Sequence, residues 1–206
     1  MKSQFVGMLA LASLFFISCN NDTDKTDETT TTRTDSSAIV NDTSGTRPDS
    51  LSTTSPVVNH AEATLSGTKP DTTVTGTVKF DAANGKVKMV LDITVPTKAG
   101  KQVAVHIHEH GDCGDMGNMA HGHWNPGAAQ HGKWGSASFH AGDIGNVKLD
   151  SKGHGTLNIE TDLWTLGGAA DKSILGKAII VHGGVDDFKT QPTGNAGTRI
   201  GCGVIR

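Results

Sequence analysis

The sequence predicts an all-β domain, either a sandwich or a barrel, on three observations. Short stretches of alternating apolar and polar residues recur from residue 73 onward, as half-buried strands require. Turn-forming residues separate these stretches, and glycine is abundant at 26 of 206 residues. No stretch repeats its apolar residues convincingly at helical spacing, so we expect short strands joined by turns and loops.

The clearest element is a hairpin over residues 73–95, which alternate around Asn84-Gly85, a dipeptide typical of two-residue hairpin turns. Five further stretches are predicted strands: 102–110, 147–149, 155–160, 175–182 and 198–205. We expect the strands on either side of the Ser151-Lys152-Gly153 turn to pair as a second hairpin. Residues 111–146 contain much Gly and His with little alternation, which indicates a long, ordered and functional loop.

The first residues have the features of an export signal. Residues 1–18 combine Lys2 with an apolar run that is too short for the ~20 residues of a membrane span. Cys19 follows in a stretch that resembles a bacterial lipobox. We therefore expect an exported lipoprotein of the bacterial envelope, anchored to a membrane through Cys19 and facing the periplasm or the cell exterior. An ordinary cleaved signal, with Cys19 incidental, is the alternative.

The chain then divides into a tether and one domain. Residues 19–59 contain the lipidated Cys19 and a Ser-, Thr- and Asp-rich segment with few large apolar residues, so this tether is expected to be disordered. Residues 60–206 are long enough for one domain with a core. They hold 14 acidic residues against 14 Lys and Arg, and this balance gives no reason to expect nucleic acid as a partner. Their two cysteines, Cys113 and Cys202, most simply form one disulfide.

Histidines are concentrated in one part of the domain. Seven of the ten lie between His106 and His140. His106 and His108 lie two residues apart in a predicted strand, so their side chains point to one face. Taken alone, the pair favours two surface histidines without a metal. The concentration, however, indicates transition metals and more than one ion, because imidazole suits Zn, Cu, Ni and Fe.

Six motifs in this region resemble the Cu/Zn superoxide dismutase family in order and spacing: HIHEHGDC (106–113), GHWNP (122–126), His131, HAGDIGN (140–146), VH (181–182) and GNAGTRIGCGVI (194–205). The resemblance covers nearly all of residues 60–206. It implies a Greek-key β-sandwich, or flattened eight-stranded barrel of immunoglobulin-like architecture, with long metal-binding loops. It also implies dismutation of superoxide to O₂ and hydrogen peroxide, with copper cycling between Cu(II) and Cu(I).

The resemblance also implies roles for particular residues, with one copper and one zinc per subunit. The implied copper ligands are His106, His108, His123 and His182. The implied zinc ligands are His123, His131, His140 and Asp143, so that His123 bridges both ions. Asp186 would join the copper ligand His106 to the zinc ligand His131. Arg199 would dock the superoxide anion beside copper, and Cys113 and Cys202 would form the family disulfide.

Two histidines depart from the family pattern. His110 and His121 stand where the family usually has other residues, and we expect both to be surface or loop histidines outside the metal sites. A copper or zinc buffer or chaperone without catalysis is the alternative function, and it predicts a missing copper ligand or arginine. The four implied copper ligands and Arg199 are all present in the sequence. The family contains homodimers and monomers, and the sequence does not choose between them.

Overall fold

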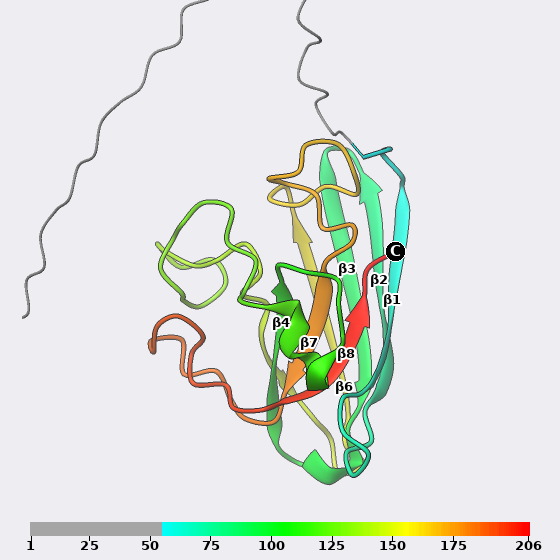
Figure 1. The fold of residues 1–206 in the computed structure, drawn as a ribbon, viewed down its shortest axis with the longest axis vertical. Helices are drawn as coiled ribbons and strands as arrows, with labels where there is room; N and C mark the ends of the chain where they lie inside the picture. Colours follow the sequence, from blue (N-terminus) through cyan, green and yellow to red (C-terminus); the bar gives the residue numbers. More distant parts are fainter. Residues whose placement is uncertain (1–54) are drawn as a thin grey trace, which may run out of the picture. The chain divides into compact units, whose positions relative to one another are not determined.

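The structure is a computed structural model, and it describes residues 55–206 (Figure 1). The predicted signal peptide, Cys19 and the tether up to residue 54 lie outside the described residues. Among the described residues, no helix has both the length and the apolar character that crossing a membrane requires.

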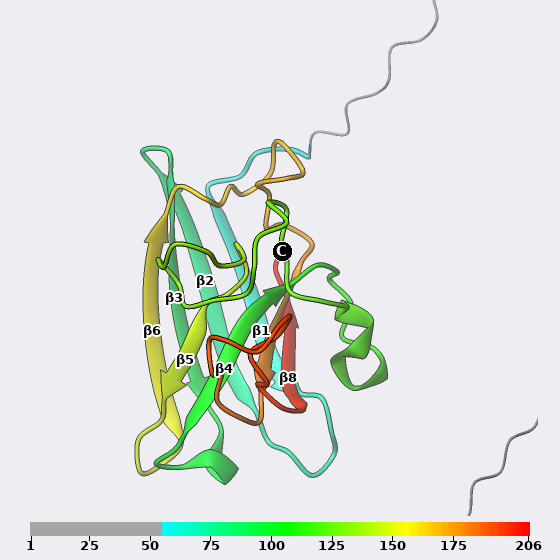
Figure 2. The same ribbon diagram turned by 90° about the vertical axis from the view of Figure 1, so that its left-hand side faces the viewer.

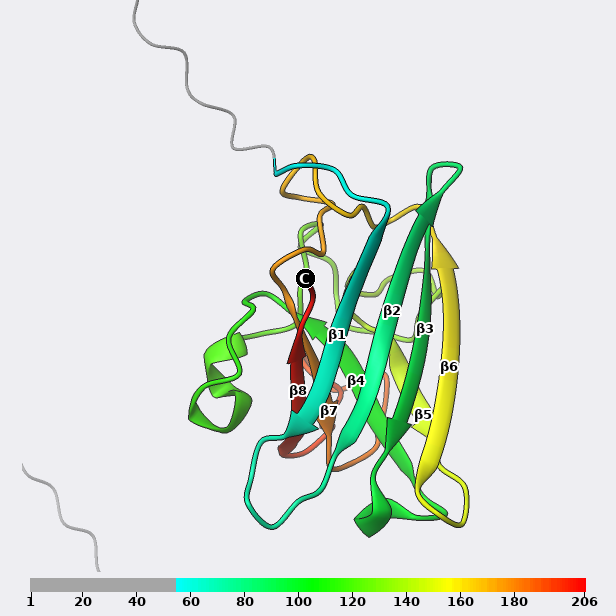
Figure 3. The same ribbon diagram turned by 90° about the vertical axis from the view of Figure 1, so that its right-hand side faces the viewer.

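The described residues form an antiparallel sheet of eight strands that curls into a nearly closed barrel, which confirms the predicted all-β fold. The strands follow one another in space as β5-β4-β7-β8-β1-β2-β3-β6. Figure 3 shows the face made by β1, β2, β3 and β6. The strand bounds are β1 (His60–Gly67), β2 (Thr75–Ala83), β3 (Lys86–Thr94), β4 (Gln102–His108), β5 (Gly145–Lys148), β6 (His154–Thr161), β7 (Ala178–His182) and β8 (Arg199–Val204).

Three connections pass between the β5-β4-β7-β8 half of the sheet and the β1-β2-β3-β6 half, as in Greek-key folds. They join β3 to β4 through the 3₁₀ helix η1 (Pro96–Lys98), β5 to β6, and β6 to β7. The predicted hairpin around Asn84-Gly85 is confirmed, since β2 and β3 pair from Thr75 opposite Thr94 to Ala83 opposite Lys86.

The second predicted hairpin is wrong. β5 pairs with β4, for example Val147 with Val103, whereas β6 pairs with β3, for example Leu157 with Leu91. The backbone still turns back on itself, because Asp150 N–H donates to the His154 carbonyl at 2.8 Å. Alternation along a strand specifies which face is buried but not which neighbour it pairs with, so the pattern predicted strands and misassigned their partners.

The core lies inside the barrel and follows the period-two pattern. Val87, Met89, Leu91 and Ile93 on β3 point inward and are at most 1% exposed, while the residues between them are not buried. Burying each such side chain stabilises the fold by roughly 1.5–3 kcal/mol. Trp164 closes one part of this core: its ring centroid lies 6.3 Å from that of Phe80 and 5.2 Å from that of Trp134.

Strand β4 departs from this pattern because both of its faces are buried. Val103, Val105 and Ile107 belong to the barrel core. His106 and His108 alternate with them and so point to the outer face, yet both are 0% exposed. Two long loops, residues 109–144 and 183–198, cover this outer face (Figure 2). The first loop contains the 3₁₀ helix η2 (Asp115–Ala120).

Candidate metal centre

Four buried histidines meet on the outer face of β4 and β7. His106 and His108 come from β4, His182 is the last residue of β7, and His123 reaches them from the 109–144 loop through a bridge to His108. One ring nitrogen of each lies within 4.8 Å of the others. The structure therefore brings together the four residues that the resemblance implies as copper ligands.

A second group lies wholly within the 109–144 loop, around the carboxylate of Asp143. His123 Nδ1 is 2.8 Å from Oδ1, His131 Nδ1 is 3.0 Å from Oδ2, and His140 Nδ1 is 3.2 Å from Oδ1. The contacts of His131 and His140 lack hydrogen-bond geometry, so neither Nδ1 has a hydrogen-bond partner. These are the four residues implied as zinc ligands, and again they lie close together.

His123 is the residue that the two groups share. Its Nδ1 contacts Asp143, while its Nε2 is buried and has no hydrogen-bond partner. Neutral imidazole offers one acceptor nitrogen, and loss of its remaining proton frees the second. The position of His123 therefore suits a ring that contacts a different cation through each nitrogen.

Asp186 connects the two groups by hydrogen bonds to one ring of each. Its Oδ2 accepts a hydrogen bond from Nε2 of His106 at 2.9 Å, and its Oδ1 accepts one from Nε2 of His131 at 2.9 Å. The carboxylate is almost completely buried. Because both Nε2 atoms carry hydrogens toward Asp186, the Nδ1 atoms keep free lone pairs that point into the two groups.

Backbone carbonyls orient the other copper-group rings in the same way. His108 Nδ1 donates to the carbonyl of His121 at 2.8 Å, and His182 Nδ1 donates to that of Gly197 at 3.3 Å. The Nε2 atoms of His108 and His182 then face each other at 3.4 Å. Each ring thus has one nitrogen fixed by a protein acceptor and one left for a ligand.

The unpartnered atoms test whether metals fit. Buried polar atoms normally have hydrogen-bond partners, yet four buried ring nitrogens have none: Nδ1 of His106, Nε2 of His123, Nδ1 of His131 and Nδ1 of His140. All four face the interior of one group or the other. Four nitrogens suit Cu(II), and three nitrogens with one carboxylate suit tetrahedral Zn(II), so the donor sets fit both ions.

Burial favours the neutral form of His106, His108 and His182 by lowering the pKa of each ring. It lowers the pKa of His106 and His108 well below 6.5, with the neighbouring His123 and His182 adding to the effect. Burial also lowers the pKa of His182 to about 4. For Asp143, burial raises the pKa, but hydrogen bonds from His123 and from backbone amides outweigh it and hold the carboxyl pKa below its ordinary value. Neutral rings and an ionised carboxylate are the ligand forms that metals need.

Arg199 begins β8 directly opposite His182 of β7, at a register irregularity between Val181 and His182. Its guanidinium donates to the carbonyls of Gly117 at 2.6 Å and His121 at 2.5 Å. Burial lowers the pKa of Arg199, but a guanidinium remains charged at neutral pH. A fixed cation therefore stands beside the copper group.

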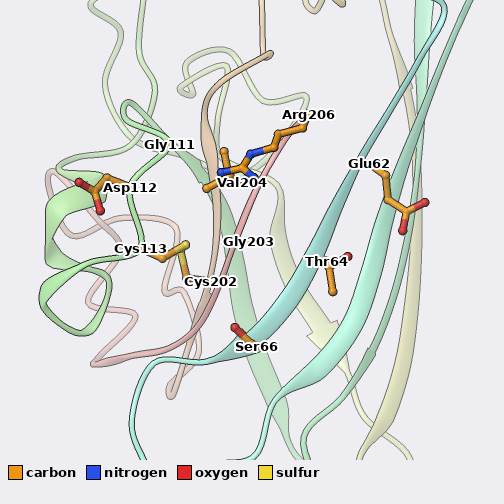
Figure 4. Close-up of a pocket in the computed structure, with 10 residues that line it drawn as sticks. All are labelled: Glu62, Thr64, Ser66, Gly111, Asp112, Cys113, Cys202, Gly203, Val204 and Arg206. Carbon is orange, nitrogen blue, oxygen red and sulfur yellow. A yellow bond between two sulfur atoms is a disulfide. The ribbon is translucent and has the colours of Figure 1, made fainter.

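The predicted disulfide joins Cys113 to Cys202 with an S–S distance of 2.01 Å, and it ties the 109–144 loop to β8. A cavity of about 660 Å³ opens beside it, between this loop, β1 and β8 (Figure 4). None of the residues of the two histidine groups lines this cavity. His110 and His121 also lie outside both groups, with exposed side chains, as expected.

Three residues without a role predicted from the sequence hold Asp186 and His131 in place. The Asn146 side chain exchanges two hydrogen bonds of 2.9 Å with the backbone of Asp186. The Gln191 side chain accepts from His131 N–H at 2.8 Å and donates to its carbonyl at 3.0 Å. Gly194 lies against Asp186 with a φ of +65°. Asn146 and Gly194 lie within the motifs HAGDIGN (140–146) and GNAGTRIGCGVI (194–205), so the family resemblance could have pointed to both.

We predict that Gly194→Ala weakens binding of both metals by roughly 10- to 100-fold, the usual effect of losing an outer partner of a metal ligand. A Cβ at this position would lie 1.9 Å from Asp186 Oδ1 and 2.5 Å from His131 Nε2, so the bridge must shift. Gly135→Ala is the matched control, because Gly135 has a φ of +78° and no atom within 4 Å of its added Cβ. Competition with a chelator measures the metal affinity of both variants. An equal loss of affinity in Gly194→Ala and Gly135→Ala would refute the steric argument.

Acid should destabilise the metal-free protein, and His182 contributes to this effect over a defined pH window. Its pKa is about 4 in the folded chain and 6.5 in the unfolded one. Between these values the unfolded chain binds more protons, so the free energy of unfolding falls as pH decreases through the window. Across the whole window, protonation of this residue lowers the free energy of unfolding by about 3 kcal/mol. Urea unfolding across pH measures the slope, which should be shallower in His182→Gln; an unchanged slope would exclude this origin.

Comparison with known proteins agrees with this geometry. The sequence model of copper/zinc superoxide dismutase (SODC) matches residues 74–205. "Superoxide dismutase [Cu-Zn]" of Paramecium bursaria Chlorella virus 1 is 38% identical over 162 residues, covering 76% of this chain and 81% of that protein. "Extracellular superoxide dismutase [Cu-Zn]" of Caenorhabditis elegans is 34% identical over 143 residues, covering 66% and 63%. The crystal structure of the clock protein EA4 superposes with a TM-score of 0.64 at 30% identity, covering 73% of this chain and 95% of that one. The chain belongs to the copper/zinc superoxide dismutase family.

Proposed function

We propose that this chain catalyses the dismutation of superoxide, in which two superoxide anions and two protons give O₂ and hydrogen peroxide. The observation that carries the proposal is the shared position of His123, whose two ring nitrogens face two different groups of donors. Membership in the copper/zinc superoxide dismutase family supports the same activity.

We assign the ligands from the free nitrogens. Copper would be held by Nδ1 of His106 and by Nε2 of His108, His123 and His182. Zinc would be held by Nδ1 of His123, His131 and His140 and by the Asp143 carboxylate. Copper would supply one-electron redox chemistry, and zinc would hold the 109–144 loop in place.

The chain itself would contribute a docking charge and a proton site. Arg199 lies opposite His182, so its guanidinium attracts a small anion to the copper group. Nε2 of His123 has no protein partner, and it can therefore hold a proton and give it to the reduced product. Asp186 keeps the ring of His106 from rotating while this happens.

We further propose that the protein is exported, with residues 1–18 as the signal and Cys19 as the lipid-bearing anchor to a bacterial envelope membrane. The Cys113–Cys202 disulfide supports an oxidising compartment, since disulfides rarely persist in the cytosol. A related nematode protein carries the name extracellular superoxide dismutase. Assembly into a homodimer stays a prediction.

The direct test of the activity is His182→Ala. Removing one of the four nitrogens around copper should reduce superoxide decay to the level of the metal-free protein, because too few donors remain to hold the ion. His154→Ala is the control, since His154 is exposed, belongs to neither group and pairs with Thr94 of β3. Decay by metal-loaded wild type no faster than by His182→Ala would favour a metal buffer instead.

A series at Arg199 separates its charge from its hydrogen bonds. Arg199→Glu should slow catalysis by roughly 10- to 1000-fold, since local electrostatic steering contributes on this scale. Arg199→Lys keeps the charge and should retain more activity than Arg199→Gln, which keeps only an amide donor. The rate of wild type should fall with ionic strength and that of Arg199→Gln should not. Equal rates across the series, with copper and zinc content unchanged, would remove Arg199 from anion docking.

A further inference from the structure

A third cluster of ligating side chains lies at the surface, outside both buried groups. Glu109, His110 and His121 place one oxygen and two nitrogens within 4.8 Å of one another, and all three side chains are exposed. The rings of His110 and His121 lie close together, with centroids 4.3 Å apart and planes tilted by 31°. None of these residues has a role in the proposed reaction through its side chain.

The backbone of this cluster is held in a fixed arrangement. Glu109 N–H donates to the carbonyl of Gly122 at 3.0 Å, and His110 N–H donates to that of Ala120 at 3.2 Å. His121 lies between these two partners as an extra residue, and its φ of 60° is uncommon for a residue with a side chain. An extra residue of this kind redirects a side chain, as in a β-bulge, and here it places His121 beside His110 and Glu109.

Neighbouring bonds fix both ends of the cluster. The carbonyl of His121 accepts from Nδ1 of His108 at 2.8 Å and from the guanidinium of Arg199 at 2.5 Å. Cys113, which follows His110 by three residues, is bonded to Cys202 of β8. The three donors therefore lie on a rigid support, and binding an ion there costs little ordering of the chain.

We propose that Glu109, His110 and His121 form a third metal site, which takes a divalent transition ion from the medium. Two imidazoles and one carboxylate suit Cu(II), Ni(II), Zn(II) and Fe(II), and they do not suit Ca(II) or Mg(II), which take oxygen ligands. Water completes the coordination because the cluster is exposed. Affinity rises from Fe(II) through Ni(II) to Cu(II), as for other sites with these donors.

Two other exposed histidines supply a natural contrast. His60 lies beside Asp81, with Nδ1 2.5 Å from Oδ1, and His154 lies beside Asp92, with Nε2 3.1 Å from Oδ1. Each pair offers only two donors, and neither forms a group of three. They are exposed single histidines with an acidic neighbour, so they control for non-specific binding of metal to surface imidazole.

The test is a calorimetric titration with Ni(II) of the full chain, after copper and zinc have been loaded, at one fixed pH. Ni(II) is chosen because it binds such donors more weakly than Cu(II) and is a poor competitor at the buried copper group. We expect one further equivalent to bind. His110→Gln and His121→Asn should each weaken it by at least roughly 10-fold, whereas His154→Gln should bind as the wild type does.

The variants are chosen to keep the fold. His121→Asn removes the ligand and keeps a residue type that is enriched at positive φ, as His itself is. Glu109→Gln provides a second, milder variant that keeps the side-chain length, and it should also weaken Ni(II) binding. Metal analysis must give one copper and one zinc in every variant. A wild type that binds no third equivalent, or a His110→Gln/His121→Asn double variant that still binds it, would overturn the proposal.

Discussion

The metal centre depends on the two hydrogen bonds that Asp186 accepts from His106 and His131. These bonds decide which nitrogen of each ring carries a hydrogen and which keeps a lone pair. They also tie the 183–198 loop to both the 109–144 loop and β4. A buried carboxylate is costly unless hydrogen bonds surround it, and the amide of Phe188 adds a third at 2.7 Å. The need for close approach explains why a glycine, Gly194, lies against this carboxylate.

The barrel stabilises this arrangement, because it folds around a hydrophobic core that contains none of the ligands. Val103, Val105 and Ile107 anchor β4 from inside, and so the outward position of His106 and His108 is set by strand geometry alone. The loops then bury these rings and leave lone pairs without partners. Such burial lowers the stability of the metal-free chain and favours cation binding, so the same unpartnered atoms are a cost to folding and a source of metal affinity.

The sequence predicted the parts of the structure that short-range patterns determine. The hairpin around Asn84-Gly85 and the shared face of His106 and His108 follow from local alternation. β1 was not predicted, because Ala61 and Ala63 give its inward face only a weak apolar signal. The partners of β5 and β6, and the clamp of Gln191 on His131, depend on contacts between distant segments, which one sequence does not reveal without a related family. The implied ligand sets came from such a resemblance, and the fold brings their members together.

Arg199 illustrates how a neutral domain can present a local positive charge. Two of its nitrogens donate to the carbonyls of Gly117 and His121, which are uncharged. In the described part of the chain, residues 55–206, no carboxylate forms an ion pair with it. Neutral acceptors position the guanidinium without cancelling its charge, whereas a carboxylate would do both. Because the same His121 carbonyl also orients His108, the docking charge and one copper ligand are held by a single peptide group.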